Sequence, residues 1–406
     1  VSVRGTTLTT ATDATGHYYL KDLPVGKHTV EAKALGYRTA THEIEISANS
    51  SQEVNFTLTE DAIALDEVVL TANRSQTLRR EAPALVNVLD SKLFDQTNAM
   101  CMAQGLNFQP GVRTENNCQN CGFSQVRING LDGHYSQILI DSRPIFTSLN
   151  GIYGLEQIPS NMIDRIEVVR GGGSALYGAS AIGGTINVIT KEPVRNSAEV
   201  SHTTTSIEGK GGMENNTTAN VSVVSEDGKT GLYVYGQHHY RPGFDHDGDG
   251  YTELPNLRNQ TLGLSAFYKF TPYSKLSLQY HNISEFRRGG NNLDLPPHEA
   301  NITEQLDHDI NGGNLAYDLS SSNYKNRYFS FSNTTRKGYY GGIGEGSFAD
   351  RIAAQKAYGR TTDFTTVTGL QYLHQFDNLL FMPSDLTLGA EYNHDALKDK
   401  IIGYNH

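Results

Sequence analysis

Apolar and polar positions alternate with period two along much of the second half of the chain. The clearest examples are TLGLSAFYKF (261–270), KLSLQYHN (275–282) and DLTLGAEYNH (385–394). Such strands have one apolar and one polar face. The tight turn TPYS joins the first two, and long polar stretches (283–308 and 338–360) join others. Short turns at one end and long loops at the other are typical of a transmembrane β-barrel, and about nine strands are expected from residue 196 onward.

Residues 1–60 have a different pattern, with short alternating runs separated by turn residues. The runs are HYYL (17–20), KHTVEAKA (27–34) and EVNFTL (53–58). This spacing predicts a small β-sandwich. Residues 61–82 form a linker around the apolar run Val68–Leu70. From pattern alone, that run is equally well the last strand of the sandwich or an exposed strand that pairs with a partner.

Residues 83–195 form a mixed α/β unit. Short helices are expected at 91–94, capped by Asp90 or Ser91, and within 98–108. Strands are expected within 123–131, 136–146 and 164–172. The glycine-rich stretch RGGGSALYGASAIGGTINVIT then allows one helical turn and a return to β-structure. A phosphate-binding loop is excluded, because the stretch has no GK[ST].

Composition narrows the class of protein. Among 406 residues, 33 are basic and 44 are acidic, and the net charge of −11 argues against a nucleic-acid partner. No window of 18 apolar residues predicts a transmembrane helix. Strand length and loop asymmetry favour a membrane barrel over a soluble antiparallel sandwich. The chain opens at Val1 in mid-strand, so we expect a fragment of a longer protein.

Three cysteines are present, Cys101, Cys118 and Cys121. The last two form a CxxC in NCQNCG, which is compatible with a redox pair or with half of a zinc site. We expect a structural disulfide in an oxidising compartment, with one cysteine left over.

Several segments in order resemble the TonB-dependent outer-membrane receptors, over residues 66–406. They are DEVVLTANR, FQPGVRTENN, VRINGL, ILIDSRPI and IDRIEVVRGGGSALYGASAIGGTINVITKEP. Ahead of them, TDATGHYYLKDLPVGKHTVEAKALGYRT resembles a carboxypeptidase-regulatory-like domain, a combination typical of Bacteroidetes receptors.

The resemblance implies a mainly β protein in the outer membrane of a Gram-negative bacterium. Its parts would be a β-sandwich truncated at its start (1–60), a linker (61–82), a mixed α/β plug (83–195) and the first part of an antiparallel transmembrane β-barrel (196–406).

The resemblance also implies roles for particular residues. The TonB box, which pairs with the energy-transducing TonB protein, corresponds to Asp66, Glu67, Val68, Val69, Leu70 and Thr71. Arg127 and Arg170 correspond to plug arginines that pair with barrel glutamates, and we expect those glutamates in strands outside this chain. The plug apices that face the substrate would contain Asn117, Gln119, Phe146 and Tyr153.

The stretch FDHDGDGYTELPN (244–256) copies the first half of a calcium loop, with Asp245, Asp247, Asp249 and then Glu253. It is not an EF-hand, since Asn256 replaces the final glutamate and no helices flank it. It is similar to the calcium loop of cobalamin receptors, and a solvated acidic loop is the alternative. The sequence therefore predicts a Ca²⁺ site on an extracellular loop.

Taken together, the motifs predict an importer of a scarce metal chelate, with cobalamin first. The alternatives are a siderophore or haem importer, a peptide or glycan importer that works with a surface lipoprotein, and a soluble β-adhesin. No nucleophile–base arrangement stands out, so no enzymatic activity is expected.

Overall fold

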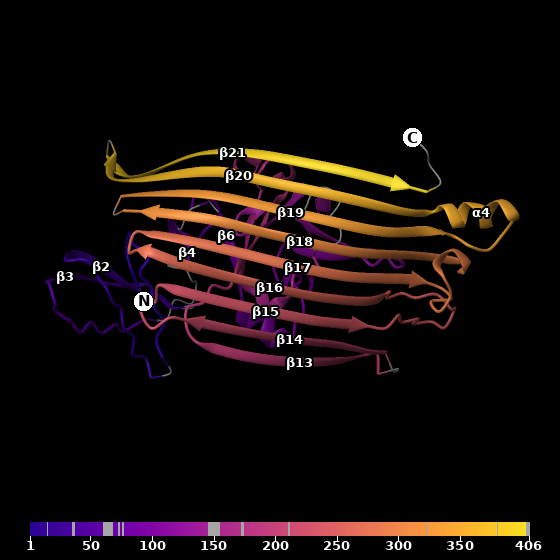
Figure 1. Ribbon diagram of the computed structural model, residues 1–406, viewed down its shortest axis with the longest axis horizontal. Coiled ribbons are helices and arrows are strands. Elements are labelled where there is room, and N and C mark those ends of the chain that lie inside the picture. Colours follow the sequence, from indigo (N-terminus) through magenta and orange to yellow (C-terminus); the bar gives the residue numbers. More distant parts are fainter. Residues whose placement is uncertain are drawn as a thin grey trace.

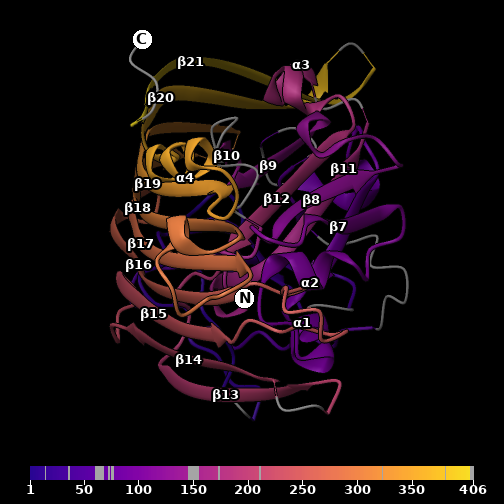
Figure 2. The same ribbon diagram turned by 90° about the vertical axis from the view of Figure 1, so that its right-hand side faces the viewer.

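The computed structural model describes the chain except residues 14, 35–36, 60–67, 72–73, 75–76, 145–154, 172–173, 210–211, 322, 380 and 403–406. A long curved sheet forms a wall, and a compact body lies against its concave face (Figures 1 and 2). A small β domain lies at the end of the wall where the short turns are (Figure 1). Within the described ranges, no helix is both long and apolar enough to cross a membrane.

The wall is a nine-stranded antiparallel sheet whose strands pair in sequence order. Its strands are β13 (Ser197–Ile207), β14 (Gly212–Val224), β15 (Thr230–Arg241), β16 (Asn256–Thr271), β17 (Ser274–Gly290), β18 (Ile302–Ser320), β19 (Tyr324–Ile343), β20 (Tyr358–Leu379) and β21 (Met382–Ile401). Loops leave one end of the wall, and one of them contains helix α4 (Phe348–Lys356).

Side chains on the wall alternate as the sequence predicted, with polar residues facing the plug. On β16, Asn259 and Thr261 are buried against the plug, whereas Leu262 is 58% exposed on the other face. Leu278, Leu315 and other large apolar side chains are exposed on that same outer face. A polar inner face and an apolar outer face suit a barrel wall in lipid, which confirms the predicted fold class.

Most wall strands are longer than the alternating runs in the sequence, and the loops are shorter than expected. Strand β20 has 22 residues, and much of 283–308 and 338–360, expected as loop, is strand. A bilayer crossing needs only about 9–11 residues, so these strands extend beyond the lipid. Outside the lipid, both faces of a strand meet water, so apolar residues no longer alternate with polar ones. The sequence of these strand ends therefore resembles that of a loop.

The plug contains a five-stranded mixed sheet of order β10-β9-β12-β11-β6 and a β7–β8 hairpin. Its elements are β6 (Val86–Asp90), α1 (Ser91–Thr97), α2 (Met102–Leu106), β7 (Val112–Cys118), β8 (Phe123–Ile128), β9 (Ser136–Ile140), β10 (Arg143–Pro144), β11 (Ile163–Arg170), α3 (Ser174–Tyr177) and β12 (Gly184–Thr190). Single 3₁₀ turns lie at Arg79–Glu81, Gly133–Tyr135, Ser160–Met162, Ala179–Ala181 and Pro297–Glu299.

One apolar core joins the plug to the wall. Plug residues such as Leu106 and Ile128 share it with wall residues such as Tyr235 and Phe331. The Tyr233 hydroxyl donates to the Asn161 carbonyl at 2.7 Å, so the plug also satisfies the polar tip of this wall tyrosine. Gly184 shows why the plug needs glycine, because a Cβ there would lie 2.5 Å from the Val169 carbonyl oxygen.

The front domain has a three-stranded sheet of β1 (Ser2–Val3), β2 (Gly26–Ala32) and β3 (Ala40–Ile46). The runs 17–20 and 53–58, predicted as strands, are irregular and lie over this sheet, where Leu20 and Phe56 pack on its core. The domain contacts the short turns of the wall, since Asp22 pairs with Lys229 at 3.0 Å.

Candidate functional site

The predicted TonB box is partly described, and its described part is folded against the plug. Asp66 and Glu67 lie outside the described residues. Strand β4 (Val68–Val69) pairs with β5 (Thr77–Leu78), and Val69 is fully buried beside Val86 and Val169. The segment is therefore anchored by packing as well as by hydrogen bonds.

A buried carboxylate holds the end of this segment, together with Tyr177 and Asn187, which donate to the Thr71 carbonyl and to Thr71 Oγ1. Glu167 on β11 is fully buried, and one of its oxygens accepts hydrogen bonds from Leu70 N (2.8 Å), Thr71 N (2.8 Å) and Thr71 Oγ1 (2.6 Å). Its other oxygen pairs with Arg165 Nη2 at 2.9 Å. Hydrogen bonds to an ionised acceptor are stronger than neutral ones, so Glu167 acts as a latch on Leu70–Thr71.

Replacing Glu167 by Gln is expected to loosen this latch. The isosteric amide removes the charge that strengthens the three hydrogen bonds, a loss of about 1.4 kcal/mol or a tenfold faster amide exchange. Hydrogen–deuterium exchange of the peptide that contains residues 68–71 measures this change. Asp164→Asn is the matched control, because Asp164 lies on the same strand and pairs with the same Arg165, but is half exposed. Equal exchange in both variants would contradict the latch.

The two arginines predicted to lock the plug lie at its surface. Arg127 pairs with Glu115 and Asp132, and both of these carboxylates belong to the plug. The Arg170 guanidinium lies beside Gly111, and among the described residues Arg170 makes no ion pair. The glutamate partners that the resemblance implies therefore stay a prediction.

Plug-to-wall ion pairs do exist, at residues that the sequence did not single out. Arg74, in the linker, pairs with Glu391 on β21 and stacks on Tyr177. On β17, Arg287 is 1% exposed and pairs with Glu156 of the plug at 2.8 Å.

The Arg287 cluster is fully enclosed between plug and wall. Arg287 also pairs with Glu285 on its own strand at 2.9 Å, and it donates to the Gly122 carbonyl at 3.0 Å. Glu285 accepts in addition from Gln157 of the plug at 3.0 Å. A buried cation thus has two carboxylate partners, one on each body, which satisfies the demand that buried charges be paired.

The predicted substrate-facing apices are only partly described. Phe146, Tyr153 and the side chain of Asn117 lie outside the described residues, whereas Gln119 is exposed in the turn of the β7–β8 hairpin. This turn also contains the CxxC.

The predicted disulfide is wrong, because all three cysteines are free thiols. Cys118 Sγ is instead directed at Glu304 on β18, with 3.4 Å between Sγ and Oε2. Burial raises the pKa of the Cys121 thiol, and so do its hydrogen bonds to Cys118 and to the Glu304 carboxylate. Cys101 lies apart from this group, and burial raises its pKa to about 12.

The four carboxylates predicted to bind Ca²⁺ converge. Oxygens of Asp245, Asp247, Asp249 and Glu253 lie within 4.8 Å of one another, in the loop between β15 and β16. The loop is closed by hydrogen bonds to Asp245, which accepts from Gly248 N at 2.7 Å and Gly250 N at 2.8 Å. Hard oxygen ligands in a turn of this kind suit Ca²⁺.

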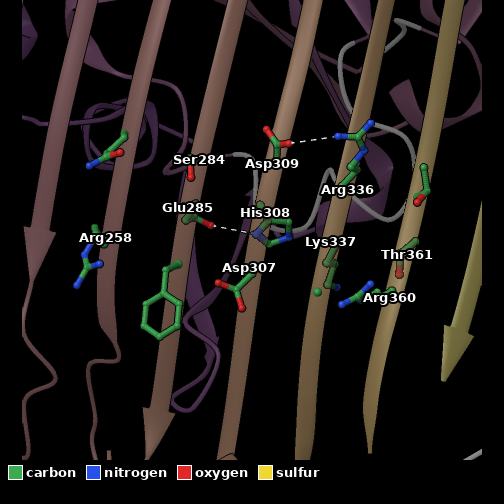
Figure 3. Close-up of a pocket in the computed structure, with 14 residues that line it drawn as sticks. Arg258, Ser284, Glu285, Asp307, His308, Asp309, Arg336, Lys337, Arg360 and Thr361 are labelled. Atoms are coloured by element: carbon green, nitrogen blue, oxygen red, sulfur yellow. Dashed lines mark ion pairs between the residues drawn. The ribbon is translucent and has the colours of Figure 1, made fainter. Parts of the chain in front are cut away.

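A hollow of about 610 Å³ crosses strands β16 to β20 near the loop end of the wall (Figure 3). Most of its lining comes from outer positions of the strands, such as the exposed Arg258, Asp307 and Arg360. Glu285, His308 and Thr361 line it from buried positions. Asp309 and Arg336 form an exposed ion pair across it at 3.8 Å. Because outer positions form most of the lining, the hollow opens on the outer face of the wall, so it does not lie on a route past the plug.

Comparison with known proteins gives two family matches. The TonB-dependent Receptor Plug Domain matches residues 79–185, and the CarboxypepD_reg-like domain matches residues 1–70.

Relatives and solved structures extend the similarity into the wall. The vitamin B12 transporter BtuB of Vibrio vulnificus (strain CMCP6) is 25% identical over 84% of this chain and 52% of its own length. The siderophore receptor PirA of Acinetobacter baumannii has a TM-score of 0.62 at 20% identity, over 78% of this chain and 48% of its own. The alcaligin receptor FauA of Bordetella pertussis has a TM-score of 0.63 at 15% identity, over 83% and 51%.

The chain spans about half the length of the curated relative that it matches over most of its residues. The solved structures, at these identities, show the fold alone. The plug match, the front-domain match and the similarity that continues into the wall agree on one family, whose members are outer-membrane receptors of Gram-negative bacteria and not enzymes. The chain contains the plug domain of the TonB-dependent receptors, behind a CarboxypepD_reg-like domain, and its similarity to that family continues into the wall.

Proposed function

We propose that the whole protein is an energy-coupled importer of the outer membrane. The observation that carries this proposal is the latch between Leu70–Thr71 and Glu167 on the plug. A pull by TonB on the box would act directly on strand β11, which lies between β12 and β6 in the plug sheet. Without that pull, the plug would stay against the concave side of the wall and would block passage of the ligand.

We propose a scarce metal chelate as the substrate, with cobalamin first. Two observations favour cobalamin. The similarity to a vitamin B12 transporter extends over most of the chain, and the Asp245–Glu253 loop gathers four carboxylates beside the wall. A Ca²⁺ ion there would join the loop into a rigid turn and neutralise its charge, which would present an ordered surface to an approaching ligand.

The roles of the other predicted residues are part of the same proposal. Arg127 and Arg170 would pair with barrel glutamates on strands outside this chain, because the guanidinium fork binds a carboxylate through two hydrogen bonds. Gln119, at the hairpin turn, would be among the first plug residues to meet a ligand from the loop side.

Cobalamin binding by the full-length protein in detergent tests the substrate. Binding is expected to be saturable and to weaken at least about tenfold when EGTA removes Ca²⁺, since the loop ligands would then repel one another. Asp245→Asn combined with Asp249→Asn is expected to weaken binding in Ca²⁺ to the same degree and to abolish the EGTA effect.

Asp294→Asn, an exposed carboxylate on the next long loop, is the matched control and should leave binding and its Ca²⁺ dependence unchanged. Affinity for a ferric siderophore or haem without affinity for cobalamin would reject the substrate and keep the importer. Co-purification of a surface lipoprotein would favour a peptide or glycan instead.

A further inference from the structure

The turn that joins β7 and β8 brings two thiols to a carboxylate on a different body. Cys118 and Cys121 belong to the plug and Glu304 belongs to β18 of the wall, yet one ligand atom from each lies within 4.8 Å of the others. Glu304 pairs in register with Gly289 on one side and Gly341 on the other, so neither residue directly opposite it has a side chain that covers it.

The wall is shaped to receive this turn. At Gly289, a Cβ would lie 2.2 Å from the Asn120 carbonyl oxygen, so only glycine allows the turn to approach so closely. Arg287 donates to the Gly122 carbonyl at 3.0 Å and so fixes the turn to the wall. Residues of the plug and of the wall together therefore determine where the turn lies.

The turn itself presents a sulfur as a ligand. The Cys121 backbone N–H donates to Cys118 Sγ at 3.3 Å, and Gly122 N donates to the Cys118 carbonyl at 2.9 Å. Gly122 has a φ of +64°, which allows the chain to fold back after the second cysteine. Hydrogen bonds of this kind orient and stabilise the thiolate ligands of metal sites.

We propose that Cys118, Cys121 and Glu304 bind a zinc-class divalent cation that joins the plug to the wall. Two thiolates and one carboxylate match the ligand preference of Zn²⁺, and three protein ligands leave its fourth tetrahedral position open to water or to an arriving ligand. The site lies two residues into β18, near the loop end of the wall.

Such an ion would tie the plug apex to the wall whatever the substrate is, so the site is independent of the proposed import. It is distinct from the Asp245–Glu253 loop in its ligands, because thiolates disfavour Ca²⁺.

Zn²⁺ alone, titrated into the reduced full-length protein against a chromophoric chelator, tests the proposal. One ion per chain is expected, and Cys118→Ser and Cys121→Ser should each weaken binding at least about a hundredfold. Glu304→Gln should weaken it about tenfold or more, which shows that the wall takes part. The matched controls are Cys101→Ser, a buried thiol outside the cluster, and Glu345→Gln, a carboxylate on another loop. Both should bind as the wild type does.

Measurements on the wild-type protein keep the test independent of whether the variants fold. Co²⁺ should give the intense visible bands of tetrahedral thiolate coordination, and X-ray absorption of the zinc form should show sulfur at about 2.3 Å and oxygen at about 2.0 Å. A Cys118–Cys121 disulfide in protein purified without reductant, with no metal bound after reduction, would overturn the site. So would zinc binding that survives the double serine variant, and an unchanged affinity in Glu304→Gln would overturn the bridge.

Discussion

Val68→Pro is expected to reduce uptake of the ligand by the full-length protein to background and to leave ligand binding unchanged. A docked strand binds its partner through main-chain hydrogen bonds. Proline has no N–H and fixes φ, so it prevents that pairing. Val68 is half-buried on β4, and it lies far from the loops and the plug apex where a ligand would bind. Uptake by whole cells and binding to purified protein, measured side by side, separate the two effects.

Val68→Ala is the matched control, because it removes the same side chain and keeps the backbone N–H. Uptake in this variant should stay within about threefold of the wild type, since a half-buried valine contributes little beyond its backbone pairing. If Val68→Pro still imports ligand, the segment is not the TonB box and is merely the last strand of a local β-pair.

Arg287→Met is expected to destabilise the seating of the plug by about 3–5 kcal/mol, since it leaves two buried carboxylates without their cation. Glu285 is fully buried and Glu156 is mostly buried, so bulk water does not stabilise either carboxylate by hydration once its cation is removed. Urea titration, with hydrogen exchange of the peptide that contains residues 155–158 as the probe, measures the loss. Adding Glu285→Gln to Arg287→Met should recover part of it, because one of the unpaired charges is removed.

The control for this prediction is Arg336→Met on β19. Its pair with Asp309 is exposed and 3.8 Å long, so the expected change is within about 0.5 kcal/mol. Equal effects of the two substitutions would show that the Arg287 cluster is solvated and that apolar contacts alone seat the plug.

Local patterns predicted the elements well. Asp90 caps helix α1 through its side chain, which accepts from Leu93 N at 2.9 Å, as the DSKLF pattern indicated. The alternation in TLGLSAFYKF predicted the two faces of β16. Both predictions succeeded because cap and strand periodicity depend on neighbours within a few residues.

Helix α4 was missed although its signal is local. Ser347 and Asp350 form a reciprocal capping box, and the following FADRIAAQK has few strand-forming residues. The prediction of a plain polar loop for 338–360 overlooked this start signal, because loop length was inferred from polarity alone.

The latch and the Arg287 cluster could not be placed from sequence for a different reason. Glu167 does interrupt an apolar strand in DRIEVVRG, and a charge in such a run indicates a buried partner. Which partner it has depends on how the linker folds back over β11, and no period in the sequence encodes that contact. Arg287 and Glu156 likewise meet only because β17 and the plug pack together. The resemblance assigned cations to the plug and anions to the barrel, whereas this pair has the opposite polarity.

Because the arginine of this pair is on the wall and the glutamate is on the plug, the pair affects the charge of the lumen after the plug has withdrawn. If the plug withdraws, Glu156 leaves with it and is hydrated, while Arg287 stays beside Glu285 on the same strand. The wall keeps a zwitterion with no net charge instead of a bare guanidinium. An electroneutral lining exerts little long-range pull on anions or cations, so a cargo that passed this point during the proposed import would not be trapped by its own charge.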